Sequence, residues 1–248
     1  MTGQGHAQIV VRDILGREQV ITQPYYVTPR LLKQGLQDYS YELGFVRRNF
    51  GTDSNNYGRP LAVGTHRIGI SEQFTGEFHG ELLSHQQTLG LSGVMLWPVA
   101  GVLSSSLAAS HSEKGVGGLL ELGFQRQGRY FSFGANTQLA SQRFAKLGLQ
   151  PEELAPRQIS QGVVNLATTD HGSFATSYAQ QAFRDRKGNK ILNASYTRKL
   201  GRLGNLSVFM TRFMSGDANT VFNLSFSIPL GDRTNASIST SAQPGREQ

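Results

Sequence analysis

Glutamate and histidine alternate in the segment EFHGE, where residue types and spacing come closest to a chemical site. Glu77, His79 and Glu81 fall on every second position. On an extended strand such residues share one face, with neighbours about 7 Å apart. A metal site needs a fourth ligand and a tighter convergence than this spacing provides. We therefore interpret the three side chains as part of a hydrated, charged wall and expect no metal ligand among them.

Signatures of enzymatic catalysis are absent from the sequence. It contains no G-x-S-x-G, no H-E-x-x-H and no P-loop pattern. It also has no cysteine, which excludes disulfides and zinc–thiolate sites. We therefore expect a protein that is not an enzyme, with no catalytic, metal or cofactor-binding residue and no cofactor.

The chain is basic, with a net charge of +7 and an isoelectric point near 9.9. Such a balance suits an anionic partner. The basic residues are nevertheless spread along the chain, and the densest short cluster is FRDRKGNK (183–190). Because no basic stripe is interleaved with aromatic residues, we expect no binding of nucleic acid.

A two-residue periodicity runs through most of the chain. In the stretch 223–230, for example, Leu224, Phe226 and Ile228 alternate with Asn223 and Ser225. This period predicts extended strands with one apolar and one polar face. No apolar run approaches the ~18 residues of a membrane helix, and no signal peptide is visible at the N-terminus. A transmembrane β-barrel fits the same data, because its signal is alternation over ~10 residues.

Thirteen such segments are long enough to form strands. They lie at about 38–50, 61–71, 74–84, 87–97, 101–111, 116–127, 129–141, 158–169, 172–184, 189–200, 204–214, 219–230 and 233–242. Most exceed the usual strand length of ~5–6 residues and reach the ~9–11 residues that a tilted strand needs to cross a bilayer. The predicted fold is therefore all-β, an antiparallel transmembrane β-barrel segment of about 13 strands. Because an odd number of strands leaves open edges that lipid does not tolerate, we expect the chain to be part of a larger barrel.

The connections between these strands predict two different rims. Tight turns recur near residues 72, 99, 128, 171, 202 and 232. Longer connections lie between them, among them HSEKG (111–115) and the polar insert RFAKLGLQPEELAPR (143–157). Short turns at one rim and long loops at the other are typical of outer-membrane barrels.

The barrel interpretation assigns the two faces of each strand. The predicted pore-lining residues are polar or charged: Glu42, Glu77, His79, Glu81, Glu121, Gln125, Asn136, Gln138, Asn193, Ser195, Asn223 and Ser225. The predicted lipid-facing residues are apolar or aromatic: Phe74, Phe78, Leu122, Phe124, Phe131, Phe133, Leu192, Tyr196, Leu224, Phe226 and Ile228. A soluble β-sandwich binding module would reverse the faces and pack the apolar residues in a dry interior.

Three stretches resemble fimbrial outer-membrane ushers of the chaperone–usher pathway. Residues 5–51, with the run PYY…LL..G..DYSYELG, resemble the segment that follows the usher plug. YTRKLGRLGNLSVFMTR and LSFSIPLGDRTNASIS resemble later barrel strands of the same family. The resemblance implies a β-hairpin and linker from a plug or middle domain at residues 1–30, and a segment of the pore at residues 31–248.

The same resemblance implies a function in pilus biogenesis. Ushers receive pilus subunits from a periplasmic chaperone, assemble them and secrete the fibre across the outer membrane of Gram-negative bacteria. The expected partners are pilus subunits, chaperone–subunit complexes and outer-membrane lipid. The chain lacks the signal peptide and most other parts of an usher, so we expect a fragment. Another outer-membrane barrel, such as a porin-like channel, is the alternative, and the plug-like hairpin at residues 5–24 argues against it.

Overall fold

The computed structural model describes residues 8–12, 18–22, 31–47, 54–149, 153–168, 171–216, 218–229 and 235–243. The strands and one short helical turn are, in chain order, β1 (Gln8–Arg12), β2 (Glu18–Thr22), β3 (Gln37–Arg47), β4 (Tyr57–Ser71), β5 (Phe74–Leu83), β6 (Gln86–Trp97), β7 (Gly101–Ser112), β8 (Gly115–Arg126), β9 (Phe131–Ala140), β10 (Gln158–Thr168), β11 (Gly172–Ala182), β12 (Asn189–Lys199), the 3₁₀ turn η1 (Gly201–Leu203), β13 (Asn205–Phe213), β14 (Asn219–Pro229) and β15 (Asn235–Ala242).

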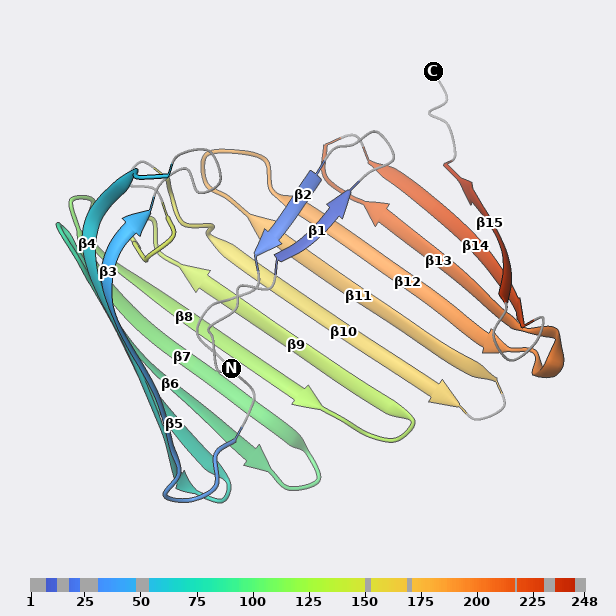
Figure 1. The fold of residues 1–248 in the computed structure, drawn as a ribbon, viewed down its shortest axis with the longest axis horizontal. Coiled ribbons are helices and arrows are strands. Elements are labelled where there is room, and N and C mark those ends of the chain that lie inside the picture. Colours follow the sequence, from blue (N-terminus) through green and yellow to red (C-terminus); the bar gives the residue numbers. More distant parts are fainter. Residues whose placement is uncertain are drawn as a thin grey trace.

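Strands β3 to β15 form one antiparallel sheet in which each strand pairs with its neighbours in sequence (Figure 1). The thirteen predicted strands are confirmed, because period-two alternation specifies both an extended backbone and its register. A single curved sheet is not a sandwich, so the alternative with a dry interior between two sheets is wrong. Within the described residues, no helix is both long and apolar enough to span a membrane.

Cross-strand register divides the side chains of this sheet between two faces. We call inner the face that carries Thr65, His79 and Glu121, and outer the face that carries Phe78 and Leu122. Many large apolar side chains on the outer face are exposed, including Leu43 (87% exposed) and Leu91 (65%). The inner face instead buries polar groups. The outer face of the sheet thus exposes apolar side chains, whereas the inner face buries many polar ones.

The sheet is not closed, and its order begins with β15 and ends with β3. These two strands lie at opposite sides of the ribbon in Figure 1. A sheet of this width and curvature with unpaired edges has the form of a segment of a larger barrel.

The two ends of the strands differ in their connections. One end, the turn rim, holds short connections such as Glu72–Gln73 and residues 98–100. The other end, the loop rim, holds the connection 141–157 between β9 and β10, which we call the insert. The loop rim also has two-residue turns at Ser84–His85 and Glu113–Lys114. The prediction of a longer connection at 111–115 was therefore wrong, because β7 and β8 pair up to Ser112 and Gly115.

Strands β1 and β2 form a separate two-stranded antiparallel sheet, with Gln8 opposite Thr22 and Arg12 opposite Glu18. This agrees with the hairpin expected near the N-terminus. The division into a plug remnant at 1–30 and a barrel segment at 31–248 remains a prediction.

Candidate functional site

The predicted site residues fall on the two faces as their alternation requires. The twelve predicted pore-lining residues lie on the inner face, and the eleven predicted lipid-facing residues lie on the outer face. They do not form one cluster. Glu42 on β3 and Asn223 on β14 lie near opposite edges of the sheet. Glu77, His79 and Glu81 lie on β5 and Glu121 lies on β8, with β6 and β7 between these two strands. Their assignment to pore and lipid remains a prediction.

Two groups of polar contacts cover the inner face of β3 to β5. The hydroxyl of Thr65 lies 2.8 Å from Nδ1 of His79, whose Nε2 lies 3.1 Å from Oε1 of Glu81. The guanidinium of Arg67 lies 3.1 Å from Glu77 and 3.4 Å from Asp38. Each buried charge thus faces an opposite charge or a hydrogen-bonding group, as burial requires.

These contacts account for all three charged or ionisable side chains of the segment EFHGE. His79 is held between Thr65 and Glu81, and Glu77 is paired with Arg67. In the described parts of the chain, no three histidine or acidic residues are grouped as metal ligands would be. Sequence reasoning missed Thr65 and Arg67. Their positions in β4, two and four residues after Val63 on the same face, were the available signal.

The insert lies against the inner face and is bonded to three strands. Leu147 donates its backbone N–H to Oε2 of Glu81 at 2.6 Å. The hydroxyl of Thr88 donates to the carbonyl of Ala145 at 2.9 Å, and the N–H of Ala145 donates to Oγ of Ser110, also at 2.9 Å. Side chains of the inner face therefore provide hydrogen-bond partners for the backbone of the insert, which does not pair with a strand.

An apolar cluster fixes the start of the insert. Phe144 is only 1% exposed and packs with Leu119, Ala140 and Ala155. Opposite it on β8 stands Gly117, where a Cβ atom would lie 2.2 Å from the backbone nitrogen of Phe144. The insert can approach the sheet this closely only because β8 has a glycine at this position.

A lysine of the insert lies close to two acidic residues of the wall. Burial lowers the pKa of Lys146, and the carboxylates of Glu81 and Glu121 oppose that shift. Glu81 and Glu121 are 0% and 2% exposed. A buried carboxylate needs compensation by charge or hydrogen bonds. The N–H of Leu147 provides this to Glu81 directly, and the attraction of Lys146 to both carboxylates offsets only part of the cost of burying its own charge.

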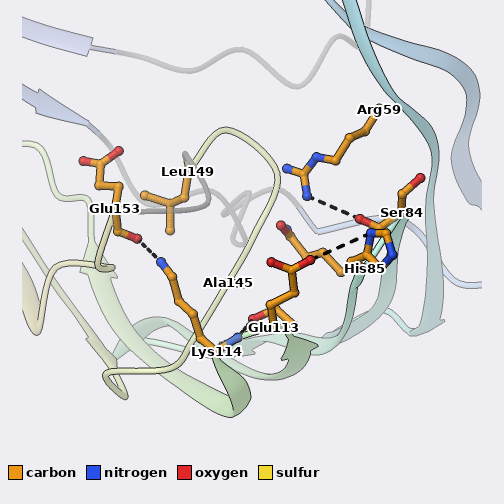
Figure 2. Close-up of a pocket in the computed structure, with 10 residues that line it drawn as sticks. Arg59, Ser84, His85, Glu113, Lys114, Ala145, Leu149 and Glu153 are labelled. Atoms are coloured by element: carbon orange, nitrogen blue, oxygen red, sulfur yellow. Dashed lines mark hydrogen bonds and ion pairs between the residues drawn. The ribbon is translucent and has the colours of Figure 1, made fainter.

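At the loop rim the insert lies beside the turns Ser84–His85 and Glu113–Lys114. A small cavity of about 120 Å³ lies between these turns and the insert, as Figure 2 shows. Nζ of Lys114 donates to the carbonyl of Glu153 at 2.5 Å. His85 and Glu113 face each other at 3.9 Å, but both are largely exposed, so this pair contributes little. Arg184, beyond β11, donates to the carbonyl of Ala155 at 3.3 Å and also to that of Ala140. The insert is therefore held by residues next to β8 and next to β11, the two strands that flank the β9–β10 hairpin.

The inner face of β7 to β12 is more open and contains a groove of about 710 Å³. Gln125, Asn136 and Asn193 line it, together with glycines at 123 and 134. Two exposed apolar side chains, Val163 and Phe209, also lie on the inner face by register. Their position in the alternation places them on this face, but nothing else in the sequence singles them out. This part of the inner face therefore combines amides and glycines with single exposed apolar side chains.

Comparison with known proteins finds structural likeness without a sequence match. No model of a protein family matches the chain, and no curated protein matches it. A chain of the cryo-EM structure of the E. coli P pilus tip assembly intermediate PapC-PapD-PapK-PapG in its second conformation is similar, with a TM-score of 0.74 and 19% identity over 98% of this chain and 32% of that one.

Two structures of the PapC translocation pore are similar as well. The structure of the P pilus usher (PapC) translocation pore has a TM-score of 0.75 and 18% identity, over 98% of this chain and 53% of that one. The crystal structure of the usher PapC translocation pore has a TM-score of 0.69 and 18% identity, over 98% of this chain and 52% of that one. This chain spans about a third to a half of these structures, and its sheet has the fold of the corresponding part of the usher translocation pore.

Proposed function

We propose that this chain is a segment of an outer-membrane usher pore that takes part in the assembly and secretion of pilus subunits. The observation that supports this most is the likeness of the whole thirteen-stranded sheet to the PapC translocation pore. The partners under this proposal are pilus subunits delivered by a periplasmic chaperone, and the surrounding lipid. The assembly intermediate that resembles the chain contains PapC, PapD, PapK and PapG.

The chemistry of the two faces suits a secretion pore. A folded subunit that slides past the inner face meets amides, hydroxyls and paired charges, which hold water and offer no apolar patch for adhesion. The outer face presents leucine and phenylalanine side chains to hydrocarbon. The backbone polar groups of all strands between the two edge strands are satisfied by the antiparallel hydrogen-bond ladder, as a membrane-spanning sheet requires. The insert occupies part of the inner face and so reduces the space beside β5 to β8.

Secretion by a grafted pore tests the proposal. Residues 31–243 would replace the matching segment of the P pilus usher, and surface pili would be counted in cells that lack another usher. The double substitution Asn193→Leu and Asn223→Leu on the inner face should reduce pili strongly, because it creates apolar contacts in the wall. The control, Leu192→Ile and Leu224→Ile on the outer face, keeps volume and polarity and should leave pili unchanged.

Membrane insertion is measured in the same cells by the shift in gel mobility between unheated and boiled samples. The proposal requires insertion of all three proteins and a loss of pili in the inner-face variant alone. Normal pilus numbers with both inner-face leucines in place would contradict it, as would a grafted protein that inserts and yet supports no pili.

A further inference from the structure

The charged residues of the large sheet are divided unequally between its faces. All five acidic residues of its strands lie on the inner face: Asp38, Glu42, Glu77, Glu81 and Glu121. Four basic residues of β8, β12 and β13 lie on the outer face: Arg126, Lys190, Arg198 and Arg212. The outer face of the strands thus carries cations without carboxylates, and within the described part of the chain none of these four pairs with an acidic group.

The four cations occupy only the ends of their strands. Arg126 and Arg198 lie within two residues of the turn rim, and Lys190 and Arg212 lie within two residues of the loop rim. Between the two rims the outer face of β12 and β13 is apolar or small, with Leu192, Ala194, Val208 and Met210. This arrangement of cation, apolar band and cation matches a bilayer with phosphate groups at both surfaces.

Lys190 and Arg212 are neighbours across the β12–β13 pair. Arg212 stands opposite Leu192, and the N–H of Met214 donates to the carbonyl of Lys190 at 2.9 Å. The two side chains are therefore on a diagonal of about 7–8 Å, within reach of one anion for residues of this length. Both are exposed, and both have apolar neighbours on the side away from the rim.

We infer that Lys190 and Arg212 form a docking site for the phosphate of an anionic lipid headgroup. The guanidinium of Arg212 can bind two phosphate oxygens at once, and the ammonium of Lys190 adds a second charge. The acyl chains of the same lipid lie against Leu192 and Met210. This site rests on the proposed function, because it requires the outer face to meet lipid, but it adds a chemical preference that a general apolar contact does not have.

Lipid binding by the full chain in a neutral detergent tests the site. Native mass spectrometry would count bound dioleoylphosphatidylglycerol and dioleoylphosphatidylcholine at increasing lipid concentrations. The chain should prefer phosphatidylglycerol, and Lys190→Gln with Arg212→Gln should weaken that binding roughly 30-fold, since each cation near a lipid phosphate contributes to affinity. Soluble glycerophosphate, which lacks acyl chains, should not compete at equal concentration.

The matched control is Lys33→Gln with Lys199→Gln. It removes the same two charges from exposed positions away from the site and should leave both lipid affinities within about twofold, because only local charges contribute within a Debye length. Lys190→Arg, which keeps the charge, should retain the preference and shows that the position tolerates substitution.

The outcomes separate the site from the proposed function. Equal binding of the two lipids, or an equal loss in the control variant, would overturn the site while leaving the outer face in lipid. A chain that binds neither lipid and remains folded and monodisperse without detergent would contradict both.

Discussion

Replacing Gly117 by alanine tests how closely the insert is held to the inner face. The added Cβ would lie 2.2 Å from the nitrogen and 2.3 Å from the Cα of Phe144. Both atoms belong to backbone, so a rotamer change cannot relieve the clash. The start of the insert must withdraw by about 1 Å to reach ordinary contact, and the Phe144 side chain moves with it.

The expected cost follows from this geometry. Overpacking a well-packed site costs about 1–3 kcal/mol, which corresponds to a roughly 5- to 150-fold loss in the docking equilibrium of the insert. The withdrawal also lengthens the bond from the N–H of Ala145 to Ser110 and the bond from the N–H of Leu147 to Glu81. Hydrogen exchange at these two amides should therefore accelerate by a similar factor.

Hydrogen-exchange mass spectrometry of the peptide that spans residues 142–149 measures this directly. The matched control is Gly118→Ala, the next residue on β8, where a Cβ points to the outer face and meets nothing closer than the Ala108 carbonyl at 3.8 Å. Its insert should exchange as in the parent protein. Equal exchange in both variants would refute the close packing of the insert on β8.

Three further perturbations address the same contacts. Phe144→Ala should destabilise the docked insert by up to about 3–5 kcal/mol, measured as lost exchange protection of Ala145, because Phe144 is almost fully buried; an unchanged protection factor would contradict its burial. Glu81→Gln should weaken docking by about 1 kcal/mol, since a neutral amide oxygen accepts the N–H of Leu147 less strongly than a carboxylate does, whereas Glu42→Gln near the β3 edge should have no effect on the insert. Docking should strengthen as the pH rises from the lowered pKa of Lys146 toward the ordinary value of a lysine, because the undocked lysine binds more protons in that window. The protection factor, referenced to intrinsic exchange at each pH, measures this; Lys146→Met should abolish the slope, and a slope that persists would assign it to another group.

The strands and their faces could be predicted because their information is local. Alternation places Leu224 and Phe226 on one face and Asn223 and Ser225 on the other, whatever the rest of the chain does. The same rule placed Glu77, His79 and Glu81 together on the inner face. Long strands and a single sheet then followed from the number of such segments.

The position of the insert could not be predicted, because its contacts are distant in sequence. Leu147 and Glu81 are 66 residues apart, and no local sequence feature of either residue indicates that they are in contact. Arg67 was missed for a related reason: a cation on a polar face is unremarkable until the fold brings Asp38 and Glu77 beside it. The turn at Glu113–Lys114 was predicted too long, because a polar composition indicates a loop but does not fix where ladder pairing stops.

A cysteine scan along β14 tests most directly whether water and lipid meet opposite faces of this sheet. The chain has no cysteine, so each single substitution gives a unique label. In membranes, labels at Asn223→Cys and Ser225→Cys should react with a charged, water-soluble thiol reagent and be insensitive to a lipid-borne quencher. Labels at Leu224→Cys and Phe226→Cys should show the reverse. Labels that behave alike at all four positions, or with the pattern inverted, would contradict a water-filled pore bounded by the inner face.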